Sequence, residues 1–281
     1  MYHFVKFYKF DYLKMKNIFR SSVLFFIYAL FSSHEFWLQP EKFIYKRGEI
    51  INIRFLVGEN FSGDNWTGNI DRVKSLCFYF GNVSDKNLGK SISKAEGDSI
   101  QLAMADEGTA MVTFESKNSF IELDAAKFNA YLREDGLTEA LEYRIQNKDS
   151  SKAGKEFYQR SVKTIIQVGD KTDHTYKQKT GLPIDIIPDD HPYNVAKDDD
   201  DFKVKFFFLG EPMKKTKVKV WHKVNNKISP AEYVTDNDGE IKFFLSPTGQ
   251  WMVSTVKMIH LEDDPKAEWQ SYWGTLTWGY E

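Results

Sequence analysis

The residues most suggestive of chemistry lie at the junction between an apolar N-terminal stretch and the polar remainder of the chain. There His34 follows Ser33 and precedes Glu35. If a leader peptide is removed directly before it, His34 carries a free α-amino group and an imidazole, which are two nitrogen ligands close together. Such nitrogens suit nickel, cobalt, copper and zinc. His34 is therefore the first candidate metal ligand, and the alternative is that it only begins an exposed strand.

A second histidine, His260, precedes the sequence Leu-Glu-Asp-Asp, so that Asp263 and Asp264 offer carboxylates near an imidazole. This combination is also compatible with a transition metal. If the first strand of the mature chain runs beside the last strands, His34 and His260 converge on one ion. The alternative, equally favoured by the sequence, is a histidine at a strand end next to a solvated acidic loop.

A weaker candidate is His191, which follows two aspartates and lies between Pro188 and Pro192. The two prolines favour a rigid turn over a metal site. Four consecutive aspartates, Asp198 to Asp201, lack the spacing and the glycine of a calcium loop, so we expect a solvated entry to a strand. The sequence contains none of the common nucleophile, zinc-protease, dithiol or phosphate-loop motifs. We therefore expect no catalytic activity.

Residues 1–33 have the character of a secretory signal peptide. Basic residues precede the apolar run from Ser22 to Phe31, which is too short to span a bilayer comfortably. Met15 also fits as the true start, because the sequence that follows it is a complete leader. The alternative is an uncleaved N-terminal anchor. We expect a periplasmic protein and, since no second apolar stretch of membrane length follows, no transmembrane helix in the mature chain.

The composition narrows the range of functions. The formal net charge is −2, which gives no support for a nucleic-acid partner. The single cysteine, Cys77, rules out an intrachain disulfide, and its apolar neighbours predict a buried thiol. Aromatic residues make up 16% of the chain, which favours a β-rich fold.

Apolar residues alternate with polar ones through most of the chain, as in half-buried strands. Two such runs flank Asp106-Glu107-Gly108, which predicts a hairpin turn. The period changes near residues 124–146, where Asp124 is a plausible N-cap and Gly136 divides two short helices. The prediction is a mainly β fold of two immunoglobulin-like β-sandwich domains, with residues 34–169 and its helical insertion forming the first, 170–183 the linker, and 184–281 the second.

A dense polar and aromatic set lies in the strand predicted just before the linker. Glu156, Tyr158 and Arg160 share one face of that strand, and Lys163 follows them. A buried ion pair that holds the two domains together is the favoured interpretation of this set. Trp269 and the aromatic residues after it fit core packing better than a glycan-binding platform.

Several long motifs resemble a known exported family. They are HEFWLQP after the leader, the strand pair YKRGEIINIRFLVGENF, and the segments LDAAKFNAYLREDGL, EFYQRSVKTIIQVG, TDNDGEIKF and EWQSYWGTLTW. Together they extend over nearly the whole mature chain. The family has no established function and is commonly labelled as the periplasmic component of nickel or cobalt uptake. The C-terminal part also resembles the immunoglobulin-like modules of the transthyretin and carboxypeptidase-regulatory kind, in which a T-D-x-D-G turn is common.

The resemblance implies a soluble exported protein that binds nickel or cobalt for an uptake system, with membrane components of that system as partners. This is the first functional hypothesis, and copper and zinc are further candidate ions. The second hypothesis is a structural or adhesive module that binds a protein or a glycan. The third is a copper oxidase with an N-terminal histidine brace, which needs a second histidine opposite His34.

Overall fold

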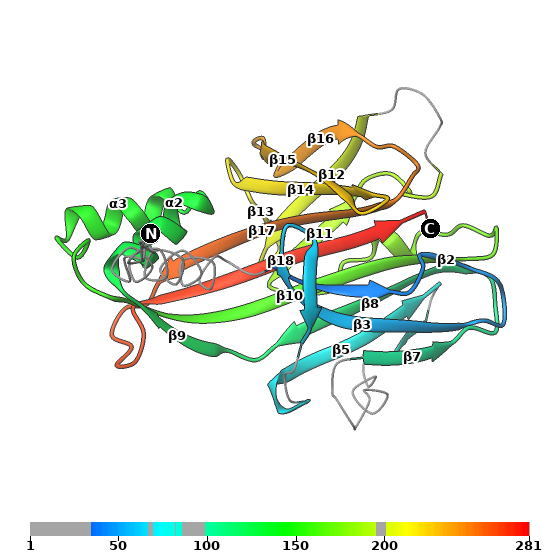
Figure 1. Ribbon diagram of the computed structural model, residues 1–281, viewed down its shortest axis with the longest axis horizontal. Helices are drawn as coiled ribbons and strands as arrows, with labels where there is room; N and C mark the ends of the chain where they lie inside the picture. The colour runs from blue at the N-terminus through cyan, green and yellow to red at the C-terminus, as the bar shows by residue number, and fades with distance from the viewer. Residues whose placement is uncertain (1–34, 67–69, 82, 86–98, 195–200, 281) are drawn as a thin grey trace, which may run out of the picture. The chain divides into compact units, whose positions relative to one another are not determined.

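The computed structural model describes residues 35–66, 70–81, 83–85, 99–194 and 201–280, and this part of the chain is mainly β, as predicted. A ten-stranded sheet forms its centre, with the order β15-β14-β17-β18-β10-β8-β5-β6 and with β2 and β9 paired to β10 (Figure 1). The strands of this central sheet are β2 (Ile44–Tyr45), β5 (Val73–Phe80), β6 (Val83–Asp85), β8 (Gly108–Ser116), β9 (Ser119–Leu123), β10 (Gly154–Val168), β14 (Lys217–Val224), β15 (Lys227–Val234), β17 (Gln250–His260) and β18 (Trp269–Gly279).

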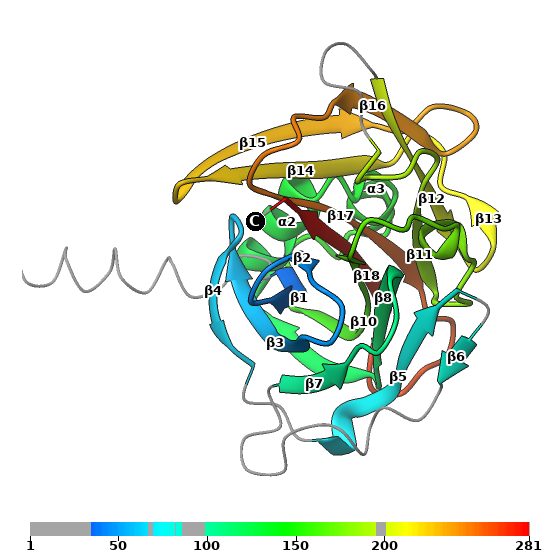
Figure 2. The same cartoon turned by 90° about the vertical axis from the view of Figure 1, so that its right-hand side faces the viewer.

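Two smaller sheets lie on opposite sides of β10 and β18 (Figure 2). The first contains β1 (Glu35–Pro40), β3 (Ile50–Glu59), β4 (Ser62–Asn65) and β7 (Ser99–Ala103), and the second contains β11 (Ile184–Pro188), β12 (Asp201–Phe208), β13 (Glu211–Pro212) and β16 (Glu240–Phe244). The layers follow from the alternation of apolar and polar residues along the strands. In β12, for example, Phe202, Val204 and Phe206 are buried in the core, while Lys203 and Lys205 between them are partly exposed. The packing is that of sheets face to face, as in a β-sandwich.

The hairpin predicted at Asp106-Glu107-Gly108 is wrong. β7 pairs with β3 in an outer sheet, whereas β8 pairs with β5 and β10 in the central sheet. Ile100 of β7 and Val112 of β8 belong to the same hydrophobic core. The two strands therefore face each other across that core, to which both contribute buried apolar side chains.

The longest strand, β10, connects the parts of the chain before and after residues 170–183. Its residues Glu156 to Thr164 pair in parallel with Trp269 to Thr277 of β18. The segment 170–183 contains the short 3₁₀ helix η3 (Thr175–Lys177) and follows β10, and residues His34–Glu281 form one compact unit. Whether this segment separates two independently folding domains stays a prediction.

Two helices, α2 (Ala125–Glu134) and α3 (Thr138–Gln146), form the predicted helical insertion and lie together near one end of the long strands (Figure 1). The Asp124 side chain accepts a hydrogen bond from the backbone N–H of Lys127 at 3.0 Å, which confirms the N-cap. Gly136 ends α2 with φ +68°. Among the described residues no helix has the length and apolar character needed to cross a membrane.

One prediction about a buried side chain is confirmed, and another is confirmed in part. Cys77 is a buried free thiol on β5. A buried ion pair joins β10 to β11, but of the predicted set only Lys163 takes part, and its partner is Asp185. The Nζ of Lys163 also donates to the carbonyl of Ile186 at 3.1 Å. Lys163 therefore fixes the first strand after residues 170–183 against the central sheet.

Candidate functional site

The leading candidate ligand, His34, lies outside the described residues, but it is bonded to Glu35, the first residue of β1. β1 crosses β18 in a fixed register. The Oγ1 of Thr275 donates to the carbonyl of Phe36 at 2.7 Å, and the Oγ1 of Thr277 donates to the carbonyl of Leu38 at 2.9 Å. Two buried hydrogen bonds therefore fix the start of β1 on β18. Further ligands of a metal ion held by His34 would come from the surroundings of Glu35.

A group of polar side chains from four parts of the chain gathers there, and we call it the start-of-β1 cluster. Glu35 comes from β1, Tyr131 from α2, Asp135 from the end of that helix, Glu156 and Arg160 from β10, and Lys219 from β14. Electrostatic interactions connect Glu35 with Lys219, Asp135 and Arg160, and connect Asp135 with Glu156 and Tyr131.

Glu35 is the first acidic member of the cluster and is only 4% exposed. Burial raises its pKa to about 7, because an ionised carboxylate loses the solvation that water provides. The charge of Lys219 opposes this rise, while the carboxylates of Asp135 and Glu59 add to it. Glu35 therefore begins the described chain as a buried acid that interacts with the acids Asp135 and Glu59 and with the bases Lys219 and Arg160.

Glu156 is the most buried acid of the cluster, at 2% exposure. Its Oε1 accepts hydrogen bonds from the hydroxyl of Tyr131 at 3.3 Å and from the hydroxyl of Ser271. Burial raises the pKa of Glu156 to about 7, and these two hydrogen bonds only partly oppose the rise. Its second oxygen, Oε2, has no hydrogen-bond partner among the described residues.

Asp135 and Lys219 form an ion pair between the helical insertion and β14, with Oδ1 and Nζ 2.6 Å apart. The other oxygen of Asp135, Oδ2, is buried and has no hydrogen-bond partner in the described part of the chain. The guanidinium of Arg160 lies over the Phe36 ring, with its Cζ 5.1 Å from the centroid. Burial lowers the pKa of Arg160, so this base is also held at an electrostatic cost.

The balance of these groups indicates what the cluster can bind. Within the cluster as defined, the three carboxyl groups of Glu35, Asp135 and Glu156 face the two bases Arg160 and Lys219. Two carboxyl oxygens are buried without a hydrogen-bond partner among the described residues. Buried carboxylates are stable only when they are protonated, paired or bound to a metal. Because the pKa values of Glu35 and Glu156 are raised to about 7, these two groups are partly protonated at neutral pH, and the arrangement leaves room for a proton or for one additional cation.

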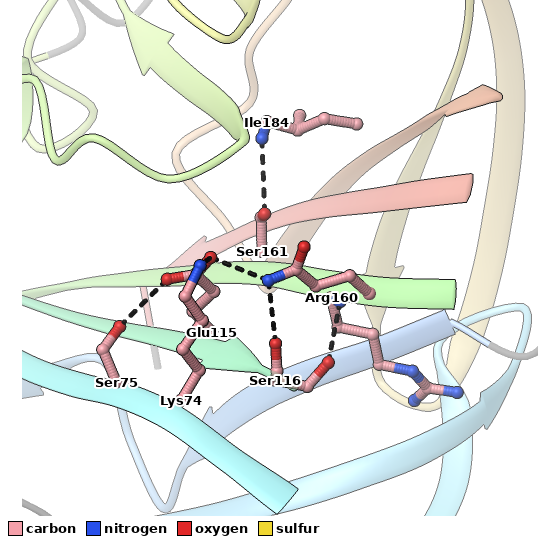
Figure 3. A network of polar contacts seen from close by, with 8 residues as sticks. Lys74, Ser75, Glu115, Ser116, Arg160, Ser161 and Ile184 are labelled. Carbon is pink, nitrogen blue, oxygen red and sulfur yellow. Dashed lines mark hydrogen bonds and ion pairs between the residues drawn. The ribbon is translucent and has the colours of Figure 1, made fainter. Parts of the chain in front are cut away.

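Another buried acid, Glu115 on β8, shows how a purely structural carboxylate differs (Figure 3). One oxygen accepts from Lys74 and from Gln159, each at 2.8 Å, and the other accepts from Ser75 at 3.4 Å. In Figure 3 the Arg160 side chain extends away from this network, and only its backbone N–H takes part. Both oxygens of Glu115 are therefore used, in contrast to those of Glu156.

His260 ends β17 in the same row of the central sheet as Glu156. Trp269 pairs with both residues and stands between them. The ring of His260 packs on Tyr143, with centroids 4.2 Å apart, and meets Trp269 edge-on at 5.1 Å. Asp264 Oδ1 accepts from the backbone N–H groups of Lys266 and Ala267 and stabilises the turn after β17.

His191 is buried, and both of its ring nitrogens are engaged. Nδ1 accepts from the backbone N–H of Tyr193 at 3.2 Å, so the proton of the neutral ring is on Nε2, which is 2.9 Å from Oγ1 of Thr109. Thr109 in turn donates to Oε1 of Gln167 at 3.2 Å. Burial lowers the pKa of His191 to about 4. These contacts match the rigid-turn interpretation of this segment.

Among the residues that the structure describes, no three His, Cys, Asp or Glu side chains group closely enough to hold a metal ion by themselves. A metal site at the start of β1 thus needs the nitrogens of His34. Glu156 and Arg160 are found from the sequence by their shared strand face, and Tyr131 is one of the apolar positions of the helical insertion. Asp135 and Lys219 are missed, because their only signal is polar character within amphipathic elements, which predicts exposure.

Comparison with known structures gives distant likenesses. One is a structure reported for host cell surface retention of a 1.5-MDa bacterial ice-binding adhesin, with 9% identity, a TM-score of 0.20, and coverage of 88% of this chain and 64% of that one. Another is Escherichia coli alpha-2-macroglobulin activated by porcine elastase, with 9% identity, a TM-score of 0.20, and coverage of 88% and 20%. A third contains three N-terminal domains of the bacteriophage RB49 Highly Immunogenic Outer Capsid protein, with 11% identity, a TM-score of 0.20, and coverage of 87% and 59%.

The chain thus spans less than two thirds of each of these structures. No curated protein matches the sequence. A family model does match, over residues 31–258, and this range includes β1, both helices, β10 and β14. The chain therefore belongs to the family described as a domain of unknown function, DUF4198.

Proposed function

We propose that the mature protein is an exported, non-catalytic binding protein that holds one divalent transition-metal ion at the start of β1. His34 is the anchor, through its α-amino and imidazole nitrogens after removal of the leader. The cargo is nickel or cobalt, which the protein passes to the membrane components of an uptake system in the periplasm. The metal label of the resembling family and the chemistry of this one place lead to the same proposal.

The observation that carries the proposal is the set of three buried carboxyl groups in the start-of-β1 cluster. Glu35 and Glu156 both have a pKa raised to about 7, and Glu156 and Asp135 each have one oxygen without a hydrogen-bond partner among the described residues. A divalent ion at this point compensates the negative charge and satisfies open oxygens. The rest of the molecule then serves to exclude water from the site.

The donor chemistry fits a transition metal better than magnesium or calcium. Two nitrogens from His34 together with carboxylate oxygens make a mixed set that nickel, cobalt, copper and zinc accept. Magnesium and calcium prefer oxygen ligands alone. Copper generally binds such sites most tightly, so selection of nickel or cobalt depends on metal availability as well as on the site.

The test is isothermal titration of the mature protein, exported so that its native N-terminus is produced, against nickel, cobalt, copper and zinc. Mass spectrometry of the same sample identifies the cleavage site. We expect one ion per chain and a loss of binding in His34→Ala. His260→Ala is the matched control, because His260 packs on Tyr143 and is separated from Glu156 by Trp269, and we expect it to bind as tightly as wild type.

Three results contradict this function. Absence of binding to all four metals removes every metal hypothesis and leaves the structural or adhesive module as the function to pursue. Tight copper binding with turnover of oxygen in the presence of a reductant identifies an oxidase instead of a carrier. Equal binding in wild type and His34→Ala places the metal at another site.

A further inference from the structure

Beside the turn between α2 and α3 the surface is hollowed, with a volume of about 190 Å³. Residues 136–140, 214–216 and 256–258 line this space, which we call the α3 hollow. None of them belongs to the start-of-β1 cluster. We propose that the α3 hollow binds a small organic acid, whose carboxylate is held by Lys214 and Lys215 and whose apolar body lies against side chains of α3 and β17.

One part of the lining is apolar. Leu137 and Ala140 come from the start of α3, and Val256 and Met258 come from β17. All four are buried members of the hydrophobic cluster between the helical insertion and the central sheet. An apolar cavity of about 150 Å³ can hold benzene. The α3 hollow therefore has room for a ligand body of about the size of one ring.

The other part of the lining carries an excess of positive charge. Lys214, Lys215 and Lys257 contribute three ammonium groups, while Glu139 contributes the one carboxylate among these lining residues. Glu139 is already paired with Lys257, with Oε2 and Nζ 3.0 Å apart. In the described part of the chain, the ammonium groups of Lys214 and Lys215 have neither an ion pair nor a hydrogen bond. Two positive charges are therefore open to an anion.

The turn that carries these two lysines is fixed by hydrogen bonds. The backbone N–H of Lys215 donates to the carbonyl of Thr235 at 3.1 Å, and that of Thr216 donates to Oγ1 of Thr235 at 2.9 Å. Oγ1 of Thr235 in turn donates to the carbonyl of Met213, whose side chain is buried in a core. The backbone is thus held in place before a ligand arrives, which lowers the entropy cost of binding.

The helical insertion is fixed against the strand that follows this turn. Nζ of Lys217, the first residue of β14, donates to the carbonyl of Glu134 at 2.9 Å and pairs with Glu232 at 2.7 Å. Gly136 lies so close to Lys217 that a Cβ added to the glycine would be 2.8 Å from the Cβ of the lysine. The two sides of the α3 hollow are therefore tied together at their base.

An organic acid matches both parts of the lining. Inorganic phosphate would leave the apolar residues in contact with water, and a neutral hydrocarbon would leave the two ammonium groups without a partner. The volume is below the roughly 300–1,000 Å³ of sites that hold drug-sized ligands. The ligand class is therefore a small carboxylate with a compact apolar body, for which benzoate is a model.

The experiment titrates the mature protein with 4-fluorobenzoate and follows the fluorine NMR signal of the acid. We expect saturable binding of one molecule per chain. Lys214→Gln and Lys215→Gln should each weaken binding by about threefold and the double variant by about tenfold, since partly exposed ion pairs are each worth a few-fold in affinity. Lys227→Gln, at an exposed position at the start of β15, is the matched control and should bind like wild type.

Two further ligands test the recognition of charge and of the apolar body. The neutral 4-fluorobenzyl alcohol should bind at least about fivefold more weakly than the acid, and an equal concentration of inorganic phosphate should not displace the acid. Equal affinity for acid and alcohol, displacement by phosphate, or unchanged binding in the double lysine variant would overturn the proposal.

Folding does not confuse the result, because Lys214 and Lys215 are exposed, and thermal unfolding of each variant checks this. Nickel titration of the double variant should match wild type, because neither lysine belongs to the start-of-β1 cluster. The organic-acid site and the metal function proposed above are therefore tested separately, and either can fail while the other stands.

Discussion

His191 illustrates how one buried side chain makes the stability of the whole protein depend on pH. Both of its ring nitrogens have partners that fit the neutral form, and its pKa is lowered to about 4 from the ordinary value near 6.5. Below pH 6.5, His191 therefore binds a proton in the unfolded chain but stays neutral in the folded chain. The contribution of His191 to the free energy of unfolding is complete above pH 6.5 and is lost as pH falls toward 4.

We predict that the free energy of unfolding, measured with urea, falls between pH 6.5 and 4 by an amount on the order of 3 kcal/mol that depends on His191. His191→Gln should be less stable at pH 7.5 and should show a flatter decline over this range. His222 on β14, whose Nε2 lies 2.8 Å from the carbonyl oxygen of Thr248, is the control, since His222→Gln should retain the wild-type slope. An equal slope in His191→Gln would show that other groups cause the acid sensitivity.

The candidate metal site shows which residues can be found from a sequence and which cannot. His34 is conspicuous because of its place after a leader, and Glu156 and Arg160 because they share a strand face. Asp135 and Lys219 look like exposed polar residues of a helix end and a strand. They become part of a buried cluster only when α2 and β14 meet, and this contact is not encoded in local periodicity.

At the scale of elements, the attachment of β11 to β10 depends on the Lys163–Asp185 ion pair. Lys163 is 1% exposed, and Asp185 also accepts from the backbone N–H of Thr180 at 2.8 Å. We predict that Lys163→Met destabilises the protein by about 3–5 kcal/mol, because it leaves a buried carboxylate without a cation. Urea unfolding measures this difference.

The double variant Lys163→Met with Asp185→Asn should recover most of that loss, since the asparagine is neutral and still accepts from Thr180. The partly exposed pair Lys257–Glu139 is the control, and Lys257→Met should cost less than about 1 kcal/mol. A double variant as unstable as the single one would show that Lys163 acts through packing and not through its charge.

Arg144 is a buried cation that stabilises the helical insertion, as Lys163 stabilises the attachment of β11. Its guanidinium is buried on the Phe128 ring and donates to Asn129 Oδ1 at 3.0 Å and to the carbonyls of Asp149 and Lys152 at 2.9 and 2.5 Å. We predict that Arg144→Met costs about 2–4 kcal/mol, because three acceptors lose their donor. Hydrogen exchange should become faster in α2 and α3.

Arg133 lies on the exposed side of α2 and is the matched control for this prediction. Arg133→Met should change stability by less than about 0.5 kcal/mol and leave exchange in the helices as it is. Protection in α2 and α3 that is unchanged in Arg144→Met would contradict the assigned role.

The elements themselves were largely predictable, whereas their partners were not. The helix N-cap at Asp124 and the break between the two helices at Gly136 depend only on neighbouring residues, and the sequence predicts both correctly. The pairing of β7 and β8 is not predictable in this way, because the alternating burial of residues 99–103 and the continuous burial of residues 108–116 both occur whether two strands pair or face each other across a core. Periodicity records which side of a strand is buried, and it does not record which strand lies beside it.

At the scale of the whole molecule, the central sheet makes the start of β1 part of the core. The parallel pairing of β10 with β18 joins residues more than one hundred positions apart, and β1 crosses β18. No local signal in the sequence predicts such a pairing. It has the consequence that the start of β1 joins the outer sheet to the central sheet, so that an ion held there, as proposed above, would act on both sheets.

Metal binding should therefore stabilise the folded protein as a unit, and by more than the local contacts alone suggest. At a free nickel concentration one hundred times the dissociation constant, the gain is about 2.7 kcal/mol. For a chain of this size each kcal/mol corresponds to a shift of about 2–4 °C, so we predict a rise in Tm of roughly 5–10 °C that a chelator reverses. A form with one extra residue before His34 loses the pairing of amine and imidazole on one residue, and its shift should be clearly smaller. Differential scanning calorimetry of the two forms, with and without nickel, measures this directly. Equal shifts in both forms would show that the free N-terminus is not a ligand, while a shift confined to the mature form would make leader removal the step that creates the site.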